Sequence, residues 1–141
     1  MDNDVFLYEE KGNVRLKLVM EFKSKQAIYL QIAEYARDQI LSGKWPSGEK
    51  IISIRDLSVI LSVNANTVQR AFDHLQQQGV LINKRGVGYF VDETAAEKIR
   101  EMRRQSFLSH DLPEFIIKMQ QLGLNFDIVM KRFTLLLQKK N

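Results

Sequence analysis

The sequence predicts a mainly α-helical fold with a small β wing, and three stretches carry this prediction. Residues 54–75 contain two short runs of apolar residues at helical spacing, separated by a turn of three residues. Residues 80–91 have the pattern of a β-hairpin with a glycine-containing turn. Residues 93–141 return to helical spacing. We therefore expect a winged helix-turn-helix domain followed by a short helical dimerisation tail.

The composition is that of an ordinary globular chain. With 141 residues, of which 45% are apolar, it can form one compact core of about 100 residues plus an appendage. The sequence has no cysteine, no signal peptide and no apolar run of about 18 residues, so we expect a cytoplasmic protein without membrane partners or disulfides. The formal net charge of +4 permits nucleic-acid binding without requiring it.

Residues 1–25 form an N-terminal arm or extension. Val14 to Phe22 partly alternates apolar with charged residues, as a strand does, but no partner strand is evident nearby. Three interpretations stay open: a flexible arm, a strand that pairs with another part of a dimer, and an upstream extension if translation begins at Met20.

The winged helix-turn-helix domain is expected to span residues 26–92 and to begin with a helix. Apolar residues at helical spacing run from Gln26 to Leu41, with Arg37 on the water-facing side. Gly43 then supplies the left-handed conformation that ends many helices. A turn containing proline and glycine follows, after which Glu49 to Ile52 has the composition of a short strand.

The two helices of residues 54–75 each follow a capping residue. Ser53 and Asn64 precede them, and each side chain has an oxygen that accepts a hydrogen bond from a first-turn N–H group. Helices joined by so short a turn cross steeply, which leaves the second helix with a protruding polar face. Side chains on that face can reach base edges, and the helix N-terminus can approach a phosphate. The face carries Asn66, Gln69, Arg70 and Asp73.

The hairpin of residues 80–91 adds a basic tip. Gly86-Val87-Gly88 forms the turn, and Lys84 and Arg85 lie at the tip. A basic hairpin directly after such a helix is a wing, which can place cations beside phosphates or in the minor groove.

The stretch from Ile28 to Val91, almost half of the chain, resembles the DNA-binding domain of GntR-family bacterial transcription regulators. The resemblance rests on the motifs IYLQI, ILSGK, PSGEK, SIRDL, NTVQRAF and GVGYFV. It implies that Arg55 and the second helix of the pair, the recognition helix, meet double-stranded DNA. It also implies that Gly86 and Gly88 let the wing tip approach the groove. The recognition-helix residues implied to contact DNA are Ala65, Asn66, Thr67, Gln69 and Arg70.

Three residues depart from the family pattern. Ile52 stands where the family usually has proline, so the entry to the first helix is less rigid. Ser62 stands where glycine is usual, and a left-handed conformation there would cost serine roughly 1 kcal/mol. Ala65 stands where arginine is common, and alanine cannot donate a hydrogen bond to guanine. Asn64 or Asn66 is then a candidate base reader, with adenine the natural target of its amide.

The tail, residues 93–141, indicates the branch of the family. We expect a helix with a capping box that begins at Thr94, a second helix capped by Asp111 and ended by Gly123, and a third capped by Asn125. So short a tail cannot bury its apolar faces alone, and a second copy of the chain is the expected cover. This resembles the YtrA-like branch, in which a small helical tail dimerises the protein. The expected interface residues are Phe107, Leu108, Phe115, Ile116, Met119, Val129, Phe133, Leu136 and Leu137.

The sequence thus indicates a homodimeric, sequence-specific DNA-binding transcription regulator, a repressor that binds a palindromic operator. The isolated His74 and His110 form no metal site or catalytic triad, and no nucleotide-binding motif occurs, so neither an enzyme nor a cofactor is expected. The alternative is a winged-helix module that binds DNA non-specifically or contacts protein or RNA. Regulation by a small-molecule effector of unknown identity is implied by the family alone.

Overall fold

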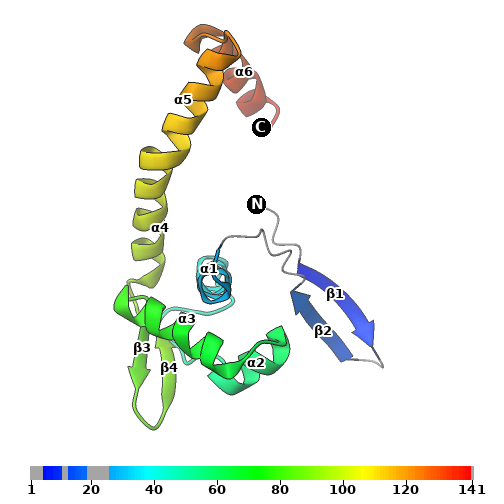
Figure 1. Ribbon diagram of the computed structural model, residues 1–141, viewed down its shortest axis with the longest axis vertical. Helices are drawn as coiled ribbons and strands as arrows, with labels where there is room; N and C mark the ends of the chain where they lie inside the picture. The colour runs from blue at the N-terminus through cyan, green and yellow to red at the C-terminus, as the bar shows by residue number, and fades with distance from the viewer. Residues whose placement is uncertain (1–4, 11–12, 19–25, 141) are drawn as a thin grey trace. The chain divides into compact units, whose positions relative to one another are not determined.

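The computed structural model describes residues 5–10, 13–18 and 26–140, and the chain divides into two compact units, Met1–Ile99 and Arg100–Asn141. Helices make up most of the described chain, and the strands form two separate two-stranded antiparallel sheets. The predicted fold class, mainly helical with a small β wing, is confirmed (Figure 1).

The N-terminal segment contains a hairpin that the sequence analysis missed. Strand β1 (Val5–Glu10) pairs with β2 (Asn13–Leu18) in a register that runs from Val5 opposite Leu18 to Glu10 opposite Asn13. The expectation that the second strand lacks a nearby partner was therefore wrong, because the partner directly precedes it. Only two residues separate the strands in the sequence, the spacing typical of a hairpin. Met20, the alternative start, lies outside the described residues.

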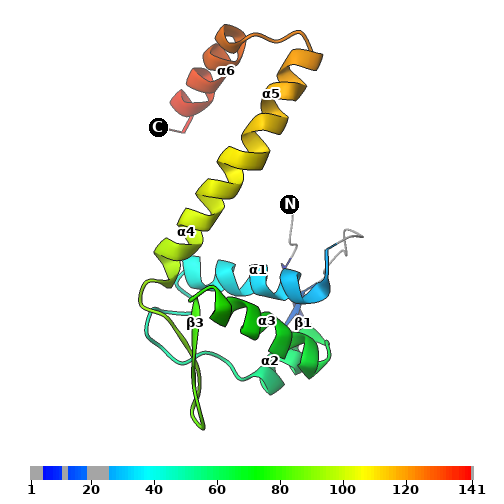
Figure 2. The same cartoon turned by 60° about the vertical axis from the view of Figure 1, so that its left-hand side comes forward.

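We call the first unit, Met1–Ile99, the winged unit. Three helices build its core: α1 (Ile28–Leu41), α2 (Ile54–Leu61) and α3 (Ala65–Gln77). Helices α1 and α3 lie side by side in both views (Figures 1 and 2). Burying the larger aliphatic and aromatic side chains of these helices contributes about 1.5–3 kcal/mol each, and this burial holds the helices together. The buried side chains are Ile32, Ala33, Ala36, Ile40, Leu57, Val68, Ala71, Phe72 and Leu75.

Both predicted helix caps are confirmed. The Ser53 hydroxyl accepts from the Asp56 N–H at 3.1 Å, and the Asn64 Oδ1 accepts from the Asn66 N–H at 2.8 Å. Between the helices, Ser62 adopts the left-handed conformation, with φ 53° and ψ 44°. It is the only residue other than glycine with positive φ in the described part of the chain. Serine thus occupies the strained turn position as expected.

The wing consists of β3 (Leu81–Lys84) and β4 (Gly88–Val91), with Leu81 opposite Val91 and Lys84 opposite Gly88. The strand expected at Glu49 to Ile52 is reduced to one bridge, between Lys50 and Phe90. Backbone bonds still hold this segment along the outer edge of β4. The Ile51 N–H donates to the Tyr89 carbonyl at 2.9 Å, and the Glu49 carbonyl accepts from the Val91 N–H at 3.0 Å.

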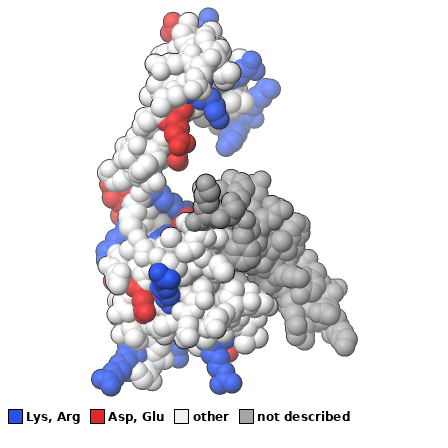
Figure 3. All heavy atoms as spheres, viewed as in Figure 1, with Lys and Arg blue, Asp and Glu red and all other residues white. Residues whose placement is uncertain are grey.

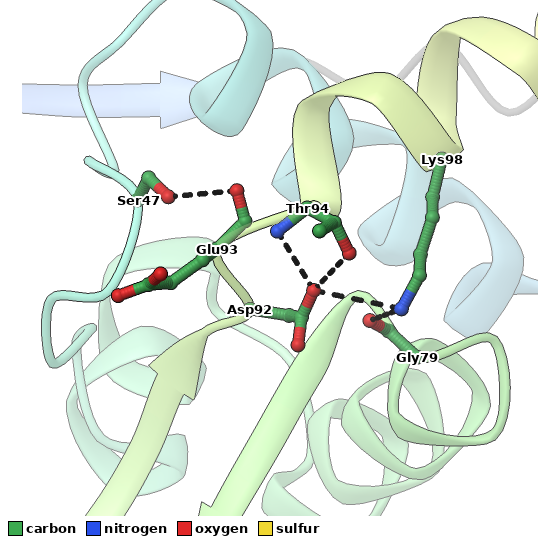
Figure 4. A network of polar contacts seen from close by, with 6 residues as sticks. All are labelled: Ser47, Gly79, Asp92, Glu93, Thr94 and Lys98. Carbon is green, nitrogen blue, oxygen red and sulfur yellow. Dashed lines mark hydrogen bonds and ion pairs between the residues drawn. The ribbon is translucent and has the colours of Figure 1, made fainter.

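Helix α4 (Ala95–Ser106) begins inside the winged unit. Ala95 and Ile99, four residues apart, are buried completely, which is why the compact unit extends to Ile99, past residue 92. A polar network also fastens this start (Figure 4). The Asp92 carboxylate accepts from the Thr94 N–H at 2.8 Å, and the Lys98 ammonium donates to the Gly79 carbonyl at 3.1 Å. The hydrogen bond of Lys98 therefore joins the start of α4 to Gly79, just after the end of α3.

The expected cap at Asp111 was wrong, because the helical backbone runs through this residue without a break. Asp111 has helical dihedral angles and makes no side-chain cap, and α4 passes through a π-helical turn, Phe107–Asp111, into α5 (Leu112–Gln121). In that turn the Leu112 N–H donates to the Phe107 carbonyl, five residues back. Proline at position 113 lacks an N–H and crowds the carbonyl four residues earlier in a regular α-helix. The wider turn relieves this conflict without ending the helix.

The last helix, α6 (Phe126–Gln138), begins as predicted. Helix α5 ends before Gly123, which has φ 67°, and Asn125 accepts from the Ile128 N–H at 3.0 Å. Both the glycine stop and the asparagine cap are confirmed.

The strain at Ser62 leads to a first prediction. Ser62→Gly should raise the free energy of unfolding by about 1 kcal/mol, because glycine adopts the left-handed conformation without a Cβ penalty. Ser58→Gly, in the interior of α2, should lower the free energy of unfolding by about 0.5–1 kcal/mol. Urea denaturation of both variants measures this. Destabilisation by Ser62→Gly would contradict the assignment of strain to this turn.

Candidate nucleic-acid interface

Helix α3 carries five of the eleven residues predicted to meet DNA, and a sixth, Asn64, caps its N-terminus. Ala65 and Asn66 are exposed in its first turn, with Thr67 half-buried behind them. The side-chain oxygen of Asn64 is occupied by its capping bond, so its amide N–H groups are what it can offer to a base. The N-terminus of α3 is thus an exposed, polar helix end, where partial positive charge attracts phosphate.

Arg70 stacks on an aromatic ring that the sequence analysis did not place beside it. Its guanidinium carbon lies 4.0 Å from the ring centroid of Tyr29, in the first turn of α1. Such a contact contributes about 0.5–1 kcal/mol at an exposed site and restricts the side chain without removing its hydrogen-bond donors. The guanidinium therefore remains exposed and can still bond a phosphate.

The same ring also meets His74, on the next turn of α3. Tyr29 and His74 are in an edge-to-face arrangement with centroids 6.0 Å apart. Partial burial lowers the pKa of His74, and the nearby Arg37 guanidinium lowers this pKa further. Arg37 does not face water as expected: its side chain is only 13% exposed, and it donates to Gln78 Oε1 at 2.7 Å and to Glu34 at 2.9 Å. Its bond to Gln78 instead ties α1 to the end of α3.

Gln69 is the most constrained of the predicted contact residues. Its amide nitrogen donates to Asp73 Oδ1 at 2.8 Å and to the Tyr89 hydroxyl at 3.0 Å. The Tyr89 ring packs against the buried ring of Phe72, with centroids 5.0 Å apart. One polar side chain thereby joins the recognition helix to strand β4 of the wing. Tyr89 and Asp73 were not among the predicted contact residues, and periodicity alone gives no signal for a contact between helix and wing.

The basic residues of the wing occupy two positions. Arg85 is exposed in the turn. Lys84 ends β3 and begins the turn, where its carbonyl accepts from the Val87 N–H at 2.9 Å, and its ammonium lies 4.1 Å from the ring centroid of Phe90. Gly86 and Gly88 have φ of 77° and 137°. A Cβ on Gly88 would lie 2.9 Å from Cε of Lys50, so this glycine leaves room for a lysine that the sequence analysis did not single out.

Arg55 lies on a separate element, in the first turn of α2. It is exposed, and its carbonyl accepts from the Ser58 hydroxyl at 2.6 Å. Figure 3 shows lysine and arginine side chains along the lower edge of the winged unit, where Figure 1 draws the wing tip and α2. The winged unit thus presents cations from α2, α3 and the wing together with exposed amides, the combination that nucleic acid requires.

The described residues contain no group of three or more His, Cys, Asp or Glu side chains placed to hold a metal ion. Likewise, none of the described helices is both long and apolar enough to cross a membrane.

Comparison with known proteins assigns the chain to a family. Residues 28–91 match the model of the bacterial regulatory proteins of the gntR family. Over 104 residues the chain is 31% identical to YhcF of Bacillus subtilis, an uncharacterized helix-turn-helix transcriptional regulator, covering 74% of this chain and 84% of YhcF. The chain belongs to the GntR family. It is also 29% identical to the transcriptional repressor YtrA of the same organism over 105 residues, 74% of this chain and 80% of YtrA.

A solved GntR-family structure extends the likeness to the fold. A chain of this family from Bacteroides thetaiotaomicron matches 82% of this chain and 100% of its own length, with 37% identity and a TM-score of 0.72. The similarity to YhcF and YtrA covers more than the winged domain and supports the predicted YtrA-like branch. The protein is therefore a GntR-family DNA-binding transcription regulator, and its relatives are regulators rather than enzymes.

Proposed function

We propose that this protein is a repressor that binds a palindromic operator as a homodimer. The observation that carries the proposal is the exposed polar face of α3, flanked by cations of α2 and the wing, in a chain of the GntR family. YtrA, the relative that matches 74% of this chain, is a transcriptional repressor. Repression follows when a bound dimer occupies DNA that the transcription machinery needs.

In the proposed complex, α3 lies in the major groove and each group of residues has its own task. Asn66 is exposed at the start of α3 and is suited to read adenine. Arg70, restrained by Tyr29, and Arg55 hold backbone phosphates or a guanine edge. Arg85 in the wing turn reaches a phosphate or the minor groove, and Lys84 reinforces the positive potential. The major groove is wide enough to admit α3, so the residues with these tasks can contact the same stretch of DNA.

The proposed dimer forms through the second unit. No residue of the π-helical turn, α5 or α6 is buried within the chain, and Phe115 and Phe133 are 49% and 52% exposed. A monomer with so many exposed large apolar side chains in one unit would be prone to aggregation, so a second copy of this tail is the proposed cover. The proposed interface contains Phe107, Leu108, Phe115, Ile116, Met119, Val129, Phe133, Leu136 and Leu137.

Arg55 provides one test of the DNA-binding surface. Because its side chain is exposed, Arg55→Ala should weaken operator binding by about 1–3 kcal/mol while the unfolding midpoint stays nearly unchanged. Fluorescence anisotropy with a labelled operator duplex measures the affinity, and thermal melting checks the fold. A loss of stability as large as the loss of binding would show that Arg55 supports the fold instead.

Substitution of Arg70 and substitution of Asn66 should change DNA binding in different ways. Arg70→Ala should lower affinity for all duplexes and reduce the slope of log K against log salt by about 1, because one phosphate contact is lost. Asn66→Ala should instead relax base preference at one position of each half-site. Titrations at several salt concentrations, with matched and mismatched duplexes, separate the two effects. The opposite pattern would exchange the two roles.

Truncation tests the tail. A chain that ends after Ser106 keeps the buried Ala95 and Ile99, so it should fold, but it should be a monomer in sedimentation. Its affinity for a full palindrome should fall by about 100-fold or more, because the second half-site is no longer bound at high effective concentration. As a full-length control, Phe115→Asp should give the same monomer. A truncated chain that stays dimeric would place the interface in the winged unit or the N-terminal hairpin.

A second outcome of these titrations concerns specificity. Equal affinity for random and operator-containing duplexes would favour a non-specific architectural protein over a repressor.

A further inference from the structure

The amide of Gln69 has only one orientation that its surroundings accept. The Asp73 carboxylate, one turn along α3, accepts hydrogen bonds and cannot donate them, so the Gln69 amide nitrogen must face it, at 2.8 Å. The reversed amide would place two oxygens together. Gln69 is therefore the defined donor and Asp73 the defined acceptor of this pair.

Both amide hydrogens of Gln69 are engaged within the protein. One points to Asp73 and the other to the Tyr89 hydroxyl at 3.0 Å. The tyrosine is itself held in place, because its ring packs against Phe72 in the core and its carbonyl accepts from the Ile51 N–H. The hydrogen-bonding atom that Gln69 retains for a ligand is Oε1, an acceptor.

This differs from the usual way in which glutamine reads DNA. A glutamine amide that is free to turn bonds adenine at two points: its oxygen accepts from N6 and its nitrogen donates to N7. With its nitrogen engaged, Gln69 can only accept. In the major groove adenine N6 and cytosine N4 are donors, whereas guanine O6 and thymine O4 are acceptors that would repel the amide oxygen.

We infer that Gln69 selects an amino base, adenine or cytosine, at one position of each operator half-site, and that Asp73 and Tyr89 set this preference as positioning residues. The inference rests on the proposed function, in which α3 enters the major groove, and it adds the chemistry that one side chain reads. Neither positioning residue needs to touch DNA for its substitution to change the base that is chosen.

The test is selection of bound sequences from a random duplex pool with the full-length protein and four variants, one of them a control. The wild type should enrich adenine or cytosine roughly fivefold or more over guanine and thymine at one position of each half-site. Gln69→Ala should abolish the preference at that position alone. Asp73→Asn should admit guanine and thymine there, because a neutral amide can donate to Gln69 Oε1 and let its nitrogen turn toward DNA.

Tyr89→Phe should shift the base preference only partly, a result that a purely structural role of Tyr89 would not produce. Losing the hydroxyl releases one amide hydrogen of Gln69, so adenine, which offers N7 as an acceptor, should gain over cytosine at the same position. Gln105→Ala is the matched control: Gln105 also donates to an acidic residue four positions away, Glu101, at 2.9 Å, but lies on α4. It should leave every base preference unchanged.

Guanine or thymine at the position that depends on Gln69 would overturn the inference, as would an unchanged preference in Asp73→Asn. If Gln69→Ala changes no base preference while an operator is still enriched, the inference fails and the proposed function stands. If no sequence is enriched by the wild type, the proposed sequence-specific function itself fails. Thermal melting of each variant separates altered reading from unfolding.

Discussion

The burial of one face of α3 is the constraint on which the rest of the winged unit depends. Val68, Ala71, Phe72 and Leu75 are completely buried. Because an α-helix has 3.6 residues per turn, fixing this face against the core also fixes the direction of the opposite face. Burial of the larger side chains, Val68, Phe72 and Leu75, contributes about 1.5–3 kcal/mol each, against about 1 kcal/mol for a typical hydrogen bond. The polar surface therefore takes its geometry from the core, and its own contacts only refine it.

Features governed by neighbouring residues were predictable from the sequence. The caps at Ser53, Asn64 and Asn125, and the glycine stop at Gly123, each depend on a few consecutive residues. The N-terminal hairpin is equally local, because two residues separate its strands, but its first strand was not recognised in the sequence. The expected start of a helix at Asp111 failed because Pro113, a residue type common in a first helical turn, is accommodated here by a π-helical turn within a continuous helix.

Contacts between distant residues were not predictable. Periodicity assigns a side chain to a face but does not say what covers that face. Arg37 bonds Gln78, 41 residues away, and Gln69 bonds Tyr89, 20 residues away. The stacking of Arg70 on Tyr29 belongs to the same class, since it needs α1 and α3 to be placed first. The sequence could therefore propose a set of contact residues, but not which of them are free to rotate and which are held.

The carboxylate of Asp73 has a consequence for how the protein would find its operator. A negative charge on a surface that approaches phosphates weakens binding to every duplex alike, because that part of the affinity is electrostatic and independent of sequence. The orientation that Asp73 imposes on Gln69 acts only where a base matches. Slightly weaker attachment to random DNA, combined with stricter reading, shortens each unproductive encounter. On the proposed surface, one acidic side chain would thus speed the search through a genome at the expense of total affinity.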